Sequence, residues 1–139
     1  MKKSLIIFVV LLSMLWSAGA FAEIKEGLWE ITTQVEIKEM PQAMPPTTTR
    51  QCITQSDPVP KNEDKNHDCK IIDQKVSGSK ISYTVECKLK EGVMHTSGTT
   101  TYTGSSMDGT SNTSFKMEGQ PPIQMSSRIK GKYIGPCPE

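Results

Sequence analysis

"KISYTVECKLK", residues 80–90, is the stretch that decides the fold, because polar and apolar side chains alternate along its whole length. One face carries Ile81, Tyr83, Val85, Cys87 and Leu89, and the other carries Lys80, Ser82, Thr84, Glu86, Lys88 and Lys90. Successive side chains of a β-strand point to opposite faces, so this pattern predicts a strand with one buried and one solvated face. Such strands are typical of antiparallel sheets.

The same period occurs in "GLWEITTQVEIK", residues 27–38, where Trp29 shares one face with Ile31, Val35 and Ile37. Burial of the indole follows from this alternation alone. We therefore expect Trp29 to anchor the core, with its partners on the threonine- and glycine-rich strand around 96–102 and on the last long strand.

Turn signals separate the expected strands at short intervals: "SGS" at 77–79, "EG" at 91–92, "DG" at 108–109 and "GQPP" at 119–122. Strands joined in this way form a meander. The sequence therefore predicts an all-β fold, an antiparallel meander of about seven or eight strands that forms a curved sheet or an up-and-down barrel.

The turns also predict a register. If the loops at 91–92 and 108–109 have two residues and the loop after Gly119 has three, the pairing of the last four strands follows. The predicted opposite pairs are Leu89 with Met94, Tyr102 with Phe115, and Met117 with Met125. Inward faces meet inward faces in every hairpin, and this agreement supports the fold.

The N-terminus has the pattern of a secretory signal. Lys2 and Lys3 precede an unbroken apolar run that ends in Ala20-Phe21-Ala22, a small-x-small cleavage site. We expect residues 1–22 to be removed after Ala22, which leaves a single β domain at 23–139. The apolar run is too short for a membrane span of about 20 residues, so no stable membrane anchor is expected after cleavage. The predicted location is the periplasm or the outside of the cell.

The charges of the chain exclude some partners. The sequence has 16 Lys and Arg against 15 Asp and Glu, and two of the lysines lie in the signal. Both signs are interspersed, also in the one dense cluster, "KNEDKNHD" at 61–68. We therefore expect no binding to nucleic acid.

The four cysteines, Cys52, Cys69, Cys87 and Cys137, predict two disulfides in an oxidising compartment. Folding the chain about Gly78 brings Cys69 opposite Cys87, but the same register turns Asp73 and Lys75 inward. A β-bulge near residues 71–72 removes the conflict, because one extra residue shifts the strand to the other phase. We therefore prefer the pairs Cys69–Cys87 and Cys52–Cys137.

No catalytic constellation is found. His67 and His95 are the only histidines, and no known nucleophile, metalloprotease or phosphate-binding motif occurs. We expect neither enzyme activity nor a cofactor. Met40 and Met44, in a proline-rich segment, are open to two interpretations: thioether ligands for Cu(I), or apolar side chains that pack a loop onto the sheet edge. The second is favoured.

Several short motifs together resemble the bacterial domain-of-unknown-function family numbered 3617. They are "GLWE" at the start of the mature domain, a proline-rich loop, "RQCIT", a threonine-rich strand with "YTG", and a closing "GKYIGPC". The resemblance covers nearly the whole mature chain and implies an exported β-rich domain, without a mechanism. Gly27-Leu28-Trp29 also resembles the start of lipocalin-type barrels, but Arg128, the one candidate to cover Trp29, is expected on the outer face.

Two classes of function remain open. In the first, the protein is a binding module that holds a small apolar ligand in a pocket lined by Trp29, Tyr83, Tyr102, Phe115 and Met117. These five residues would otherwise belong to a packed core. In the second, it is a structural or interaction protein of the envelope that meets a partner through an edge strand or the proline-rich loop.

Overall fold

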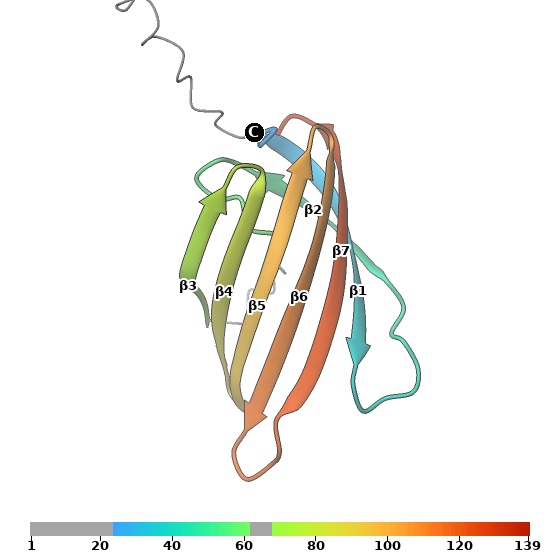
Figure 1. The fold of residues 1–139 in the computed structure, drawn as a ribbon, viewed down its shortest axis with the longest axis vertical. Helices are drawn as coiled ribbons and strands as arrows, with labels where there is room; N and C mark the ends of the chain where they lie inside the picture. The colour runs from blue at the N-terminus through green and yellow to red at the C-terminus, as the bar shows by residue number, and fades with distance from the viewer. Residues whose placement is uncertain (1–23, 62–67) are drawn as a thin grey trace, which may run out of the picture.

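The computed structural model describes residues 24–61 and 68–139, so the predicted signal at 1–22 lies outside the described residues. The described strands are β1 (Gly27–Ile37), β2 (Thr47–Ile53), β3 (Asp68–Ser77), β4 (Lys80–Leu89), β5 (Gly92–Thr103), β6 (Ser106–Met117) and β7 (Ile123–Gly135). They form one antiparallel sheet in the order β2-β1-β7-β6-β5-β4-β3. The sheet curls into a half-barrel with β2 and β3 at its edges (Figure 1). The predicted all-β antiparallel fold is confirmed, as a curved sheet.

The sheet is made of two pieces of chain. Strands β3 to β7 follow one another as the predicted meander, whereas β1 and β2 form a separate hairpin. The two pieces meet where β1 pairs with β7, with Trp29 opposite Tyr133. The first and last of the described strands, β1 and β7, therefore lie side by side within the sheet (Figure 1).

For β4 to β7 the predicted faces are correct, but the predicted pairs between neighbouring strands are not. Across β4 and β5 the structure pairs Cys87, and not Leu89, with Met94. Across β5 and β6 it pairs Tyr102 with Met107 in place of Phe115. Across β6 and β7 it is Thr113 that lies opposite Met125. Each slip is an even number of residues, and an even slip leaves every side chain on the same face.

Two glycines that the sequence assigns to turns lie inside strands. Gly92 and Gly109 have no room for a side chain, because a Cβ there would lie 2.2 Å from the Lys116 carbonyl oxygen and 2.8 Å from that of Thr99. They permit close approach of neighbouring strands. The β5–β6 turn instead uses Gly104, whose φ of 59° is in the left-handed region.

The predicted bulge in β3 is confirmed. Cys69 pairs with Cys87 and Ile71 with Val85, but the register shifts at Ile72. The two disulfides join Cys69 to Cys87 and Cys52 to Cys137, the pairs expected from the sequence. The second disulfide ties the edge strand β2 to the end of the chain beyond β7.

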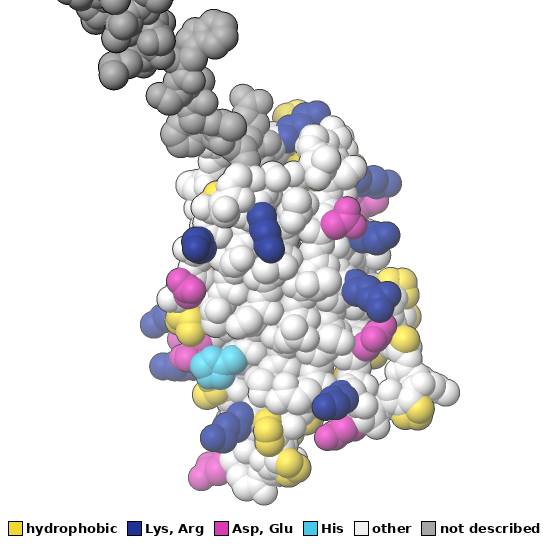
Figure 2. All heavy atoms as spheres, in the orientation of Figure 1, with side chains coloured by type: hydrophobic (Ala, Val, Ile, Leu, Met, Phe, Trp, Pro, Cys, Tyr) yellow, Lys and Arg dark blue, Asp and Glu magenta, His cyan; other side chains and the backbone are white. Residues whose placement is uncertain are grey.

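The convex face of the sheet is solvated and carries both signs of charge. Figure 2 views β3 to β7 from this side and shows Lys and Arg interspersed with Asp and Glu around a centre of uncoloured atoms. Within the described residues, no helix is long and apolar enough to cross a bilayer.

Candidate functional site

The concave face of the half-barrel has a packed half, centred on Trp29. This side chain is completely buried, and its ring makes edge-on contacts with Tyr102 and Tyr133, with centroids 5.4 and 5.9 Å apart. Its indole Nε1 donates a hydrogen bond of 2.9 Å to the Lys25 carbonyl oxygen. Tyr102 lies on β5 and Tyr133 on β7, the two strands on which the sequence places the partners of Trp29.

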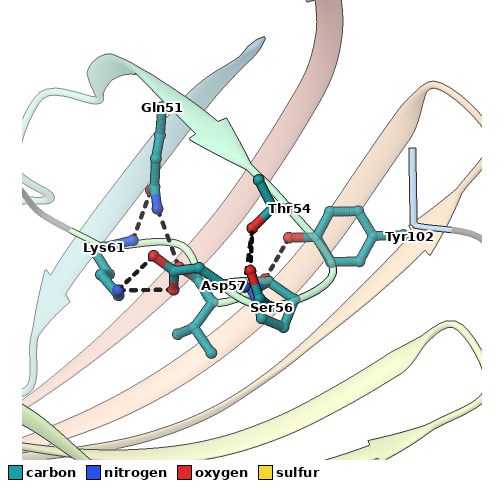
Figure 3. A network of polar contacts seen from close by, with 8 residues as sticks. Gln51, Thr54, Ser56, Asp57, Lys61 and Tyr102 are labelled. Carbon is teal, nitrogen blue, oxygen red and sulfur yellow. Dashed lines mark hydrogen bonds and ion pairs between the residues drawn. The ribbon is translucent and has the colours of Figure 1, made fainter. Parts of the chain in front are cut away.

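A connecting segment, residues 54–61, fills this half of the barrel and forms what we call the plug. Pro58 and Val59 of the plug are fully buried among the core side chains. The Tyr102 hydroxyl donates a hydrogen bond of 2.6 Å to the Pro58 carbonyl oxygen (Figure 3). The space next to Trp29 is therefore occupied by the protein's own chain.

Gln51, a buried polar residue of β2, holds the plug in place. Its amide nitrogen Nε2 donates to the Val59 carbonyl oxygen over 3.2 Å, and its Oε1 accepts from the Lys61 amide over 2.8 Å (Figure 3). At the surface of the plug, the Lys61 ammonium lies 2.7 Å from the Asp57 carboxylate. Sequence reasoning missed this segment; its one signal is the apolar "PVP" at 58–60, between polar stretches.

Of the five residues predicted to line a pocket or core, three lie in this packed half. Trp29, Tyr83 and Tyr102 are 0, 5 and 3% exposed. Burial raises the pKa of both tyrosine phenols, and for Tyr102 the nearby Tyr83 and Asp57 raise it further. Both phenols are therefore neutral around pH 7. The structure does not bring all five residues together, since Phe115 and Met117 lie further along the sheet.

Phe115 and Met117 belong to the other half of the concave face, which we call the open floor. It is lined by half-buried apolar side chains of β1 and β4 to β7: Ile37, Val85, Leu89, Met94, Phe115, Met117, Ile123 and Met125. The registers place Met94, Phe115 and Ile123 directly side by side across three strands. The open floor is therefore one continuous apolar surface.

Polar and small residues mark the inner end of the open floor. The Thr96 and Thr113 hydroxyls share a hydrogen bond of 2.8 Å across β5 and β6. Beyond them Tyr83 lies over Gly98, where a Cβ atom would be 2.6 Å from the tyrosine hydroxyl. From Met117 to Thr113 the floor spans four residue steps, about 14 Å at about 3.4 Å per residue.

The proline-rich loop between β1 and β2 borders a second concave region. An open cleft of about 830 Å³ lies between this loop, the end of β1, Asn112 in the middle of β6 and the start of β7. The loop is held to the sheet by main-chain hydrogen bonds, from the Lys38 amide to the Gln124 carbonyl (3.1 Å) and from the Met44 amide to the Val35 carbonyl (3.4 Å). Met40 and Met44 are 56 and 44% exposed, so the loop packs on the sheet mainly through its backbone. This exposure disagrees with the favoured interpretation, in which the two methionines pack the loop onto the sheet edge, and Cu(I) binding stays the disfavoured alternative.

The remaining candidate residues lie apart from the concave face. His95 is on the convex face, with its Nε2 3.7 Å from a Glu86 carboxylate oxygen, and His67 lies outside the described residues. Asp73 is exposed, because the bulge turns it outward.

Arg128 is exposed on the convex face, so it does not cover Trp29 as the late arginine of a lipocalin-type barrel would. Tyr102 and Tyr133 contact the indole instead. Residues 24–61 and 68–139 contain no group of three His, Cys, Asp or Glu side chains arranged to hold a metal ion.

Fold and site together define a disulfide-crosslinked antiparallel half-barrel, with a plugged half and an apolar open floor. The chain belongs to the family described as "Protein of unknown function (DUF3617)", which matches residues 24–137. Searches among curated proteins and among solved structures gave no match.

Proposed function

We propose that the protein is an exported binding module that holds a small apolar ligand, of the acyl-chain type, on the open floor. The observation that carries this proposal is the continuous surface of half-buried apolar side chains on the concave side of the sheet. Concave, mostly apolar surfaces with a few polar groups are typical of small-molecule sites. The proposal assigns no catalytic role to the chain.

The chemistry of the floor favours a flexible hydrocarbon. Three of its side chains, Met94, Met117 and Met125, are methionines, which adapt to ligands of irregular shape. Each methylene group removed from water contributes about 0.8 kcal/mol, so a chain that follows the floor gains affinity along its length. The Thr96–Thr113 pair would set the inner limit of such a ligand.

Two features support export. The N-terminal pattern is that of a secretory signal cleaved after Ala22. The mature domain has two disulfides, which persist in oxidising compartments and are rare in reducing ones. We therefore place the binding module in the periplasm or outside the cell.

Native mass spectrometry of protein purified from its own periplasm tests the proposal. We expect a stoichiometric extra mass in the wild type, and binding of a fluorescent fatty acid after the protein has been stripped of ligand. Phe115→Glu places a carboxylate on the floor and should abolish both signals. Lys116→Glu, the neighbouring position on the convex face, is the matched control and should retain them. Absence of both signals in the folded wild type would refute the proposal.

The alternative function is that of an envelope interaction protein without a ligand. The exposed apolar residues of the edge strand β3 favour it, because free strand edges are sites of pairing with other chains. The two functions differ in the mass spectrum, since only the binding module retains a small molecule.

A further inference from the structure

The edge strand β3 combines a free backbone with exposed apolar side chains. In the described part of the chain it pairs only with β4. Ile71, Ile72 and Val76 are 37, 55 and 54% exposed, although large apolar residues are normally covered. A strand edge of this kind offers both hydrogen-bonding groups and apolar area to a partner.

The backbone groups at this edge can be assigned from the disulfide that joins β3 to β4. The Cα atoms of Cys69 and Cys87 are 4.0 Å apart, the close spacing of an antiparallel pair that exchanges no backbone hydrogen bonds. The N–H and C=O of Cys69 therefore point away from β4, to the free edge. Gln74 pairs with Tyr83, which lies four residues before Cys87 on β4. Because this spacing is even, the backbone groups of Gln74 point to the same edge as those of Cys69.

Four charged residues of β3 alternate in sign on the convex face. Asp68, Lys70, Asp73 and Lys75 pair with Lys88, Glu86, Thr84 and Ser82 of β4, all on that face. Asp68 and Lys75 are an odd number of positions apart and would lie on opposite faces of an unbroken strand. They share a face because the bulge at Ile72 takes up one residue.

We propose that two copies of the protein pair through β3, antiparallel about a two-fold axis that passes near Ile72 perpendicular to the sheet. In this arrangement Asp68 lies opposite Lys75 of the second copy, and Lys70 lies opposite Asp73 of the second copy. Two-fold symmetry repeats both contacts, which gives four ion pairs on the convex face. Cys69 faces Gln74 of the second copy, so the backbone groups that both residues present to the edge meet each other.

The charges select this register over its neighbours. A slip of two residues in one direction brings Asp68 opposite Asp73 of the second copy. The same slip in the other direction brings Lys70 opposite Lys75. Like charges directly opposite each other are destabilising, so both slipped registers are disfavoured. Charged residues on an edge usually prevent pairing, but here their order makes the strand complementary to a second copy of itself.

The exposed isoleucines of β3 lie at the centre of the proposed contact between the two copies. Ile71 and Ile72 are next to the two-fold axis, so each copy covers the isoleucines of the other. Exposed ion pairs contribute little free energy individually, so burial and backbone hydrogen bonds hold the copies together while the charges fix their register. Because the axis is perpendicular to the sheet, both concave faces open to the same side. The pairing is independent of any ligand on the open floor.

Charge exchange with recombination of the variants tests the pairing. Lys70→Glu with Lys75→Glu makes the edge wholly acidic, and Asp68→Lys with Asp73→Lys makes it wholly basic. We expect the wild type to sediment as a dimer at high protein concentration. Each double variant should be monomeric at that concentration, with a dissociation constant raised at least about tenfold, because four unlike pairs become like pairs. An equimolar mixture of the two variants should sediment as a dimer again.

The matched control is Lys116→Glu with Arg128→Glu, which makes the same charge change on the convex face away from β3 and should leave the dimer intact. Recovery of the dimer in the mixture also shows that both variants fold. A wild type that is monomeric up to millimolar concentration would overturn the proposal. So would a dimer that survives both charge exchanges, or variants that fold but fail to associate when mixed.

Discussion

Replacement of Trp29 by alanine is the sharpest test of the packed half of the barrel. A buried tryptophan removes on the order of 200 Å² from water, which at about 25 cal/mol per Å² is about 5 kcal/mol. Alanine keeps a small part of this contribution, and the rigid surroundings of Tyr102 and Tyr133 limit collapse of the cavity. We therefore expect the free energy of unfolding to fall by about 3–5 kcal/mol.

Urea titration followed by far-UV circular dichroism measures this change, because Trp29 is the only tryptophan among the described residues and the variant loses its fluorescence. Trp29→Phe is the graded control: it keeps most of the packing but not the hydrogen bond to Lys25, so we expect a loss of about 1–2 kcal/mol. If Trp29→Ala left the unfolding midpoint unchanged and abolished ligand binding, the indole would be a binding contact and the core assignment would be wrong.

Three further predictions concern the tyrosines of the core. Gly98→Ala should lower the free energy of unfolding by about 1–3 kcal/mol, because the new Cβ meets the Tyr83 hydroxyl, and Tyr83→Leu in the same chain should reduce this loss in a double-mutant cycle. Tyr102→Phe leaves the Pro58 carbonyl without its donor, so urea unfolding should show a loss of about 1–2 kcal/mol and limited proteolysis should cut the plug faster than in the wild type. Both phenols have raised pKa values in the folded state, so the folded protein keeps protons that the unfolded chain releases above its ordinary tyrosine pKa of 10.0. The contribution of these two tyrosines to stability should therefore be constant up to about pH 9 and fall as the pH rises through 10, less steeply in Tyr102→Phe; a rise of this contribution in that range would contradict the assigned burial.

The sequence predicts which face of the sheet a side chain lies on better than it predicts which residue lies opposite on the next strand. The glycines explain this difference. Alternation assigns each residue to a face whatever the register, so Tyr83, Tyr102 and Met117 are all placed inward correctly. The position of a turn, by contrast, depends on the role of each glycine, which can either form the turn itself or allow two strands to approach closely. Gly109 looks like a hairpin turn in "DG", yet it lies within β6 because Thr99 and Thr100 approach it closely. Local sequence does not separate this use of glycine from a left-handed turn.

Long-range features were the hardest to predict. The alternation of apolar and polar residues in β1 does not show which strand it pairs with by backbone hydrogen bonds. The same alternation would fit beside any strand of the meander, so the pairing of β1 with β7 could not be predicted. The plug was missed for a related reason, since its burial depends on the space beside Trp29 and on the hydrogen bonds of Gln51. The division of the five candidate pocket residues between packed half and open floor follows from the plug. Cys69–Cys87 could be derived because both residues lie in one hairpin.

The place of β7 between β1 and β6 constrains the order in which the sheet can be assembled. A polypeptide emerges from the ribosome N-terminus first, so the β1–β2 hairpin and the strands β3 to β6 are available before residues 123–135. Until then these two pieces share no ladder, and the long strands β1 and β6 are both bare templates for intermolecular pairing. Cys52 can form its disulfide only later still, because its partner Cys137 comes after β7 in the chain. A chain that stops before β7 is therefore two incomplete sheets, exposed to aggregation along the edges that the final strand would have joined.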